Sequence, residues 1–458
     1  MLSFTKVIVL AALMFSLTAQ AKPKNSSSTL EKKLKAMNSS GTRVSAEIFN
    51  LATNEVLLKV NAETPLNPAS TIKLFTGYTA LKKLGPAFTY KTEVKVNGDG
   101  GLCVKGGGDP SFVMEDLYLL VERLRRKGIE SYSGDITLDA SIFDEEFYPE
   151  DRSDQDSERA YNAPIAGLNF NYNTISVFVT PKAKGEAANV GLDYPFDFVH
   201  IQGKVITGSG TDVSWGKKGS GDLEIVSLGG KIGVGAEEWH KPFRIRNPSL
   251  AFGEAFSKQL KMQGIAARGK VNVKKGSCSN GEIVYESKPL SYVIQLMDKY
   301  SNNFIADSFV KMLDHEVNHK QGTAEGGLKI VRNEMKAAGI DLTTRGRNYV
   351  SGSGLTLDNR AAAEDFVALL KHVYREKLYL PELFTSLPIA SVDGTLKRKY
   401  KGTPAASRLR GKTGSLDGVQ SLVGIYPNDN GDWLAVAFIV NGGRPIPEQE
   451  LAEFLGEQ

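Results

Sequence analysis

A serine and a lysine stand three residues apart at the predicted start of a helix. Ser70-Thr71-Ile72-Lys73 follows Pro68-Ala69, and apolar residues recur at helical spacing over 71–84 before Gly85-Pro86. Residues three apart share a helix face, so the Lys73 amine can reach the Ser70 hydroxyl. A serine hydroxyl needs a positioned base, and a lysine can serve where its surroundings disfavour the ammonium form. The spacing therefore indicates Ser70 as a nucleophile and Lys73 as its general base.

A second polar group, Ser301-Asn302-Asn303, comes directly before the apolar run from Phe304 to Leu313. The Ser301 hydroxyl both donates and accepts hydrogen bonds, so it can relay a proton. The Asn303 amide can hold a substrate carbonyl. We expect both side chains to face the Ser70–Lys73 pair.

A third group, Lys412-Thr413-Gly414-Ser415, lies at the expected edge of a terminal strand. The Lys412 and Thr413 side chains can bind a carboxylate, and Gly414 leaves room for a substrate backbone beside the strand. We expect the backbone N–H groups of Ser70 and Ser415 to form an oxyanion hole.

Each of these groups is weak evidence by itself, because Ser-x-x-Lys and Lys-Thr-Gly arise by chance in many chains. An N-cap serine, a solvated lysine and a turn glycine would explain them one at a time. Together and in this order, they are the set found in serine β-lactamases and penicillin-binding proteins.

A rival motif follows the second group. His315-Glu316-Val317-Asn318-His319 fits His-Glu-x-x-His, and two histidines four apart on a helix, with Glu316 as base, could form a zinc hydrolase site. The pair falls where the helix begun by the second group is expected to end. Histidines there also suit the helix dipole without any metal. We favour this second interpretation and expect no metal.

The N-terminus has the pattern of an export signal. Lys6 precedes an apolar run over 7–17, and Ala19-Gln20-Ala21 provides a small-x-small cleavage site. The run is shorter than the roughly 20 residues needed to cross a bilayer, and no later stretch is apolar enough. We predict a signal peptide over 1–21, a mature protein that starts near Lys22 without a stable membrane span, and a periplasmic location.

Composition excludes other classes of protein. The chain has 458 residues, 41% hydrophobic and 24% charged, which allows two or three domains with large cores. The formal net charge of +4 is spread out, without a basic block, and gives no case for nucleic acid. Cys103 and Cys278 are the two cysteines. In an exported protein they form either a disulfide or two separate buried thiols, and the sequence leaves both open.

The order of predicted elements indicates a discontinuous α+β domain. Residues 22–87 carry a helix over 30–37, a hairpin over 44–60 and the Ser70 helix. Residues 288–458 carry helices over 289–313, 325–338 and 360–374 and strands over 421–426 and 433–441. Between them, 88–287 alternates short β-rich runs with Gly and Asn turns around one predicted helix, 114–126. We expect this stretch to be a nested, mostly-β insertion of one or two subdomains.

The chain resembles the penicillin-binding protein 4 family, the class C low-molecular-mass D-alanyl-D-alanine carboxypeptidases and endopeptidases. The resemblance covers nearly the whole predicted mature chain. Besides the three groups, it rests on segments that match the family's nucleophile segment, insertion and later landmarks. These are 66–73, 107–110, 141–144, 161–164, 169–171, 353–355, 359–360 and 393–396. Roughly 230 residues separate Lys73 from Ser301, a much longer interval than in a β-lactamase.

The resemblance implies a serine β-lactamase/transpeptidase-like fold and a peptidoglycan stem peptide as substrate. The enzyme would remove a terminal D-Ala or cut a D-Ala cross-link through an acyl-enzyme on Ser70, without a cofactor. β-Lactam antibiotics would acylate the same residue. A zinc peptidase and a non-catalytic cell-wall binding protein are the alternatives.

Overall fold

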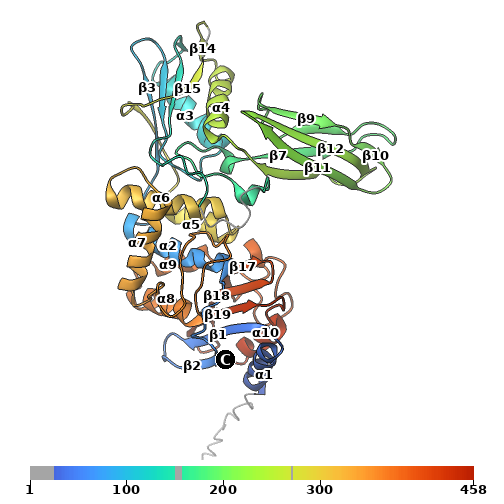
Figure 1. Cartoon of the computed structure of the whole chain (residues 1–458), viewed down its shortest axis with the longest axis vertical. Helices are drawn as coiled ribbons and strands as arrows, with labels where there is room; N and C mark the ends of the chain where they lie inside the picture. Colours follow the sequence, from blue (N-terminus) through green and yellow to red (C-terminus); the bar gives the residue numbers. More distant parts are fainter. Residues whose placement is uncertain (1–24, 150–156, 270–271) are drawn as a thin grey trace, which may run out of the picture.

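The computed structural model describes residues 25–149, 157–269 and 272–458. The predicted leader, 1–21, lies outside these residues. A five-stranded antiparallel sheet in the order β17-β18-β19-β1-β2 joins the two ends of the chain (Figure 1). Its strands are β1 (Arg43–Asn50), β2 (Val56–Val60), β17 (Arg410–Leu416), β18 (Val419–Pro427) and β19 (Trp433–Asn441).

Helices cover both faces of this sheet. One face carries α2 (Lys73–Leu84), α7 (Ala324–Ala337), α8 (Ala363–Glu376) and α9 (Leu380–Ser386). α5 (Leu290–Lys299) and α6 (Asn303–Asn318) pack against α2. The other face of the sheet carries α1 (Asn25–Ser39) and α10 (Glu448–Gly456), which lie side by side in Figure 1. Successive strand residues therefore enter different cores: Phe49 packs with α2 and α8, and Ile48 packs with α1 and α10. Every residue of β1 after Arg43 is buried for this reason.

The predicted helix over 289–313 is two helices. α5 ends at Lys299 and α6 begins at Asn303, because Ser301 adopts a left-handed conformation with φ 55°. The Asn302 side chain caps α6 by accepting a hydrogen bond from Ile305 N at 3.1 Å. This break places the second polar group at a helix start.

The middle of the chain forms a second region above the helices in Figure 1. A five-stranded sheet in the order β15-β6-β4-β3-β16 packs there against α3 and α4. The strands of this sheet are β3 (Lys91–Val96), β4 (Leu102–Lys105), β6 (Ile136–Asp139), β15 (Val273–Lys275) and β16 (Ile283–Glu286), and the helices are α3 (Met114–Arg126) and α4 (Pro248–Met262). β5 (Ser131–Tyr132) and β14 (Ala266–Ala267) form a separate short pair of strands. The prediction of a single helix in this region is wrong, because α4 is a second one. The sequence does carry signals of its start, because Asn247 is a favourable N-cap and Pro248 is favoured at the first helical position.

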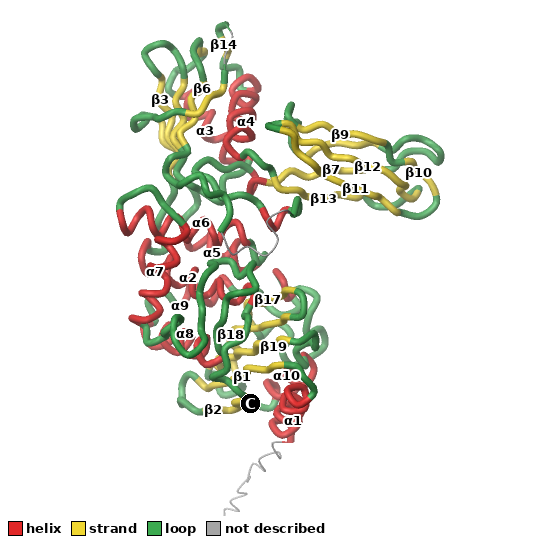
Figure 2. The backbone as a smooth tube through the Cα atoms, viewed as in Figure 1, coloured by secondary structure: helices red, strands yellow, loops and turns green. Residues whose placement is uncertain are grey.

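A lobe of strands projects sideways from this region (Figure 2). One sheet has the order β13-β7-β8, and the other pairs β12 with β9, β10 and β11. The strands are β7 (Thr174–Thr180), β8 (Asn189–Leu192), β9 (Val199–Gly203), β10 (Ile206–Gly208), β11 (Asp212–Ser220), β12 (Leu223–Gly233) and β13 (Trp239–Arg244). We propose that the insertion thus comprises two subdomains within 88–287, nested in a catalytic domain formed by 22–87 and 288–458.

A disulfide closes the first of these two regions. Cys103 in β4 is bonded to Cys278, just after β15. The bond settles the question that the sequence left open, and it joins the beginning of the middle region to its end. No helix within the described residues is long and apolar enough to cross a membrane.

Candidate active site

Ser70 lies in a short 3-10 turn, η1 (Ala69–Ile72), that leads directly into α2. Ala69 has a left-handed conformation with φ 45°, which costs an ordinary residue on the order of 1–3 kcal/mol and requires support from its surroundings. The Asn67 side chain provides part of that support by accepting from Ala69 N at 2.8 Å. Gly354 packs so closely against the Ala69 carbonyl that an added Cβ would lie 2.2 Å from it. The turn is therefore held by a distant loop as well as by its own sequence.

The Lys73 side chain is fully buried, and its amine lies beside the Ser70 hydroxyl. Its Nζ lies 2.9 Å from Ser70 Oγ and 2.8 Å from Asn303 Oδ1, and it also contacts the Ser353 carbonyl. The amine thus contacts one hydroxyl and two carbonyl oxygens. These contacts join the first polar group to the second across 230 residues of sequence.

Asn303 has a fixed amide orientation. Its Nδ2 donates to the Tyr161 carbonyl at 3.2 Å, which turns Oδ1 toward Lys73. Tyr161 belongs to η2 (Ala160–Asn162), a turn from the middle region of the chain. The inserted sequence therefore contributes a backbone contact to the site.

Lys412 joins the third group to the second. Its buried Nζ donates to Ser301 Oγ at 2.8 Å and to the Thr413 carbonyl at 2.7 Å. Burial lowers the pKa of Lys412 to about 8, and the negative charge of Asp298 opposes that shift. Thr413 Oγ1 donates to Thr395 Oγ1 at 2.7 Å, so its hydroxyl also has a fixed place.

Gly414 allows β17 to lie against η1, the turn that holds Ser70 and is called the nucleophile turn below. A Cβ on Gly414 would lie 2.9 Å from Ser70 N and 2.7 Å from the Pro68 carbonyl, so only glycine allows this approach. β17 is the edge strand of its sheet, and Gly411 N donates outward to the Pro388 carbonyl. Strand N–H groups alternate in direction, so Ser415 N points to the same free edge as Gly411 N. The backbone amides of Ser70 and Ser415 can therefore converge on one oxygen atom.

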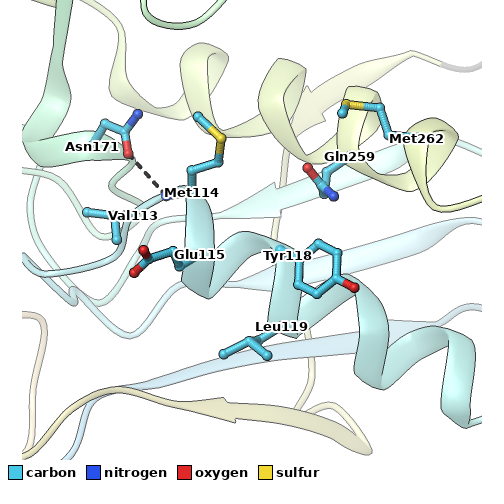
Figure 3. A pocket seen from close by; sticks show the side chains of 8 residues that line it. All are labelled: Val113, Met114, Glu115, Tyr118, Leu119, Asn171, Gln259 and Met262. Carbon is cyan, nitrogen blue, oxygen red and sulfur yellow. Dashed lines mark hydrogen bonds between the residues drawn. The ribbon is translucent and has the colours of Figure 1, made fainter.

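The hollow beside this strand is small. A cavity of about 130 Å³ adjoins Thr413, Gly414 and Ser415. A larger one, about 730 Å³, lies between α3 and α4 in the middle region (Figure 3). There Met114 and Tyr118 face Met262 across an apolar hollow, which contains no member of the three polar groups.

A sequence model of the D-Ala-D-Ala carboxypeptidase 3 (S13) family matches residues 27–453. The chain belongs to this family. It is therefore placed among the serine-type D-alanyl-D-alanine carboxypeptidases, and the predicted resemblance to the penicillin-binding protein 4 family is confirmed.

Individual proteins similar to this S13 protein support the same family assignment. It is 28% identical to a D-alanyl-D-alanine carboxypeptidase of Actinomadura sp. (strain R39), covering 90% of this chain and 81% of that relative. It is 27% identical to the D-alanyl-D-alanine carboxypeptidase DacB of Haemophilus influenzae, covering 88% and 86%. The crystal structure of penicillin binding protein 4 (dacB) from H. influenzae matches 93% of this chain and 97% of its own, with a TM-score of 0.78 and 25% identity. The predicted α+β transpeptidase-like fold is confirmed.

The zinc motif is not a helical pair in the structure. His315 lies within α6, and its Nδ1 contacts the Lys320 carbonyl at 2.6 Å. His319 is the residue after α6 and has left-handed φ 52°. No cluster of three potential metal ligands occurs among the described residues. Membership of a serine peptidase family favours the Ser70 site.

Several residues of the candidate site were given no role from the sequence, although Tyr161, Ser353 and Thr395 lie in segments that resemble family landmarks. Ser353 and Tyr161 contribute backbone carbonyls, which any residue type would supply. Thr395 contacts Thr413 from η4 (Gly394–Leu396), 18 residues earlier in the sequence. Asp298 lies next to the second polar group, and its burial could not be inferred from spacing.

Proposed function

We propose that this S13 enzyme is an exported serine DD-peptidase that forms an acyl-enzyme on Ser70. It removes the terminal D-Ala of peptidoglycan stem peptides and also cuts D-Ala cross-links, and penicillins acylate it as substrate mimics. The placement of the Lys73 amine among Ser70 Oγ, Asn303 Oδ1 and the Ser353 carbonyl carries the proposal.

This placement favours a lysine that accepts a proton from Ser70. Two of its neighbours, Asn303 Oδ1 and the Ser353 carbonyl, only accept hydrogen bonds, so they take two N–H groups. A neutral amine can then direct its lone pair at Ser70 Oγ, 2.9 Å away. Burial of Lys73 disfavours the ammonium form in the same sense.

In acylation, Ser70 Oγ bonds to the substrate carbonyl carbon and its proton passes to Lys73. The carbonyl oxygen becomes an oxyanion, for which the Ser70 and Ser415 amides are the donors. The bond from carbon to the leaving amine then breaks, and the proton held by Lys73 passes through Ser301, which lies beside Lys412, to the leaving nitrogen. Lys412 and Thr413 would bind the carboxylate of the leaving D-Ala.

In deacylation, water attacks the acyl carbon and gives a proton to Lys73. The bond from that carbon to Ser70 Oγ then breaks, Ser70 Oγ takes the proton back, and the shortened peptide leaves as a carboxylic acid. A cross-link differs from a terminal D-Ala in the amine that leaves, so one acyl-enzyme serves both reactions. A β-lactam ring would enter by the same attack. The solved H. influenzae penicillin binding protein 4 in complex with a β-lactam, 25% identical to this chain with a TM-score of 0.73, supports that reading.

Export rests on the sequence of 1–21, with its charge, apolar run and small-x-small site. Cell fractionation should place the protein in the periplasm, and N-terminal sequencing should start near Lys22. Retention of residues 1–21 would refute cleavage.

The test of activity compares wild type with Ser70→Ala on two substrates. One is a peptide ending in D-Ala-D-Ala, and the other is a stem-peptide dimer joined through D-Ala. Chromatography should show wild type converting both and the variant converting neither. Hydrolysis of the first substrate alone would restrict the enzyme to carboxypeptidase activity. Turnover of neither by a folded wild-type protein would favour a non-catalytic binding role.

A further inference from the structure

Two successive carbonyl groups of one loop bind side chains of α2. The Gly352 carbonyl accepts a hydrogen bond from Thr76 Oγ1 at 2.7 Å, and the next carbonyl, that of Ser353, accepts one from Lys73 Nζ. Thr76 comes one turn after Lys73, so the two side chains share a face of the helix. The loop therefore lies along this face, with one carbonyl on Lys73 and the other on a neutral residue.

The direction of the hydrogen bonds at Thr76 follows from its neighbours. Thr76 has no exposed surface, and its Oγ1 lies 2.7 Å from both the Gly352 carbonyl oxygen and Tyr349 Oη. A carbonyl oxygen only accepts, so the single hydroxyl proton of Thr76 goes to Gly352. The Tyr349 hydroxyl must then donate to Thr76, and burial raises the pKa of Tyr349, which keeps that proton in place. A threonine within a helix can bond to a carbonyl of the preceding turn, but here the proton is used on the loop.

The remainder of the loop is held by Asn359, whose side chain is fully buried. Its Oδ1 accepts from Val350 N at 2.8 Å and from Ser351 N at 3.1 Å, and its Nδ2 donates to the Ser351 carbonyl at 3.0 Å. Ser351 Oγ in turn accepts from Gly354 N at 3.2 Å. These bonds fix the shape of the loop, and the bond from Thr76 fixes its distance from α2.

We propose that Thr76 is a positioning residue of the peptidase, whose hydroxyl holds this loop against α2 and thereby keeps the Ser353 carbonyl on the Lys73 amine. The inference rests on the proposed mechanism, in which Lys73 accepts the Ser70 proton. Without the Thr76 hydroxyl, the Gly352 carbonyl is buried without its donor, so the loop shifts to satisfy it. The adjoining Ser353 carbonyl moves with the loop, and the amine loses one of the acceptors that direct its lone pair at Ser70.

A purely structural role for Thr76 would have different consequences. A weakened core lowers the fraction of folded enzyme and the amplitude of acylation, whereas each folded molecule still reacts at the wild-type rate. A misdirected amine slows the acylation step itself. Because Thr76 has no exposed surface, the noncovalent binding of penicillin should stay the same. The limiting acylation rate and the dissociation constant therefore separate the two roles.

The experiment measures penicillin acylation by stopped flow for wild type, Thr76→Val, Thr76→Ser and Tyr349→Phe. Thr76→Val keeps the shape of the side chain and removes the hydroxyl. Its limiting acylation rate should fall by about 10–100-fold, the effect of a misplaced catalytic group, while its dissociation constant stays at the wild-type value. The solvent isotope effect on this rate should rise, because proton transfer to Lys73 becomes slower.

Two variants serve as matched controls. Thr76→Ser restores the hydroxyl and should react within a few-fold of wild type. Tyr349→Phe removes a buried hydroxyl from the same cluster but leaves the bond from Thr76 to Gly352, so its limiting rate should also stay within a few-fold of wild type.

Equal limiting rates for Thr76→Val and Thr76→Ser would overturn the inference, as would equal losses in Thr76→Val and Tyr349→Phe. If Thr76→Val does not fold, neutron diffraction from wild-type crystals in heavy water replaces it. The Thr76 deuterium should point at the Gly352 oxygen, and a deuterium turned toward Tyr349 would overturn the inference. Failure of wild type to acylate at Ser70 would instead overturn the proposed function, so the two failures are distinguishable.

Discussion

Substitution of Gly414 by alanine would test whether β17 and the nucleophile turn form one oxyanion hole. The added Cβ would lie 2.2 Å from Ser421 Oγ, 2.7 Å from the Pro68 carbonyl and 2.9 Å from Ser70 N. The hydroxyl of Ser421 can rotate, but the other two atoms are backbone. Ordinary van der Waals contact begins at 3.4 Å, so the strand has to retreat by about 0.7 Å from the Pro68 carbonyl.

Displacement of the strand would weaken the hydrogen bonds that stabilise the oxyanion of the transition state. Ser415 N is the next amide along the strand and would move away from Ser70 N with the rest of β17. Loss of one oxyanion donor costs on the order of 10²–10³ in kcat, and a misplacement near 1 Å alone costs about 10². We expect kcat for a D-Ala-D-Ala peptide to fall by about 10²–10³, with the penicillin acylation rate falling in parallel.

Gly411→Ala is the matched control on the same strand. There the Cβ would meet a Leu422 methyl at 2.8 Å, and the nearest backbone atom, the Val423 carbonyl oxygen, lies 3.4 Å away. Steady-state kinetics and circular dichroism of both variants make the comparison. Folded Gly414→Ala with kcat within a few-fold of Gly411→Ala would refute the oxyanion assignment.

Three further perturbations follow from the structure. Lys73→Arg keeps a positive charge that cannot be given up at working pH, so acylation should fall steeply; a wild-type rate in stopped-flow assays would exclude Lys73 as the base. Replacing Cys103 and Cys278 by serine opens a loop of 175 residues, and the chain-entropy model predicts a loss of about 5 kcal/mol in the free energy of unfolding. Calorimetry should therefore show the middle region unfolding at a lower temperature than in wild type. An unchanged transition temperature would contradict this. The double variant His315→Ala/His319→Ala should turn over substrate nearly as wild type does, and a chelator should not change the rate. Loss of activity both in the double variant and in chelated wild type, with zinc restoring the chelated sample, would support the zinc alternative.

The parts of the site that depend on short-range spacing were predictable. Ser70 and Lys73 are one turn apart, and their contact follows from helix geometry. The glycine at 414 indicated a close approach, although not that Ser70 N is the neighbour.

The remainder depends on packing between segments far apart in sequence. The Ser353 carbonyl, the pairing of Cys103 with Cys278 and the burial of Asp298 are set by tertiary structure, which periodicity does not encode. α4 is a different case, because its apolar residues and its Asn247-Pro248 start are helix signals that the sequence itself carries.

Mass spectrometry after penicillin treatment tests the central claim most directly. Intact wild-type protein should gain the mass of one penicillin, and peptide mapping should place the adduct on Ser70. Ser70→Ala should gain no mass while keeping the wild-type circular dichroism spectrum. An adduct on Ser301 or any other residue of wild type, or an equal mass gain in Ser70→Ala, would contradict the account.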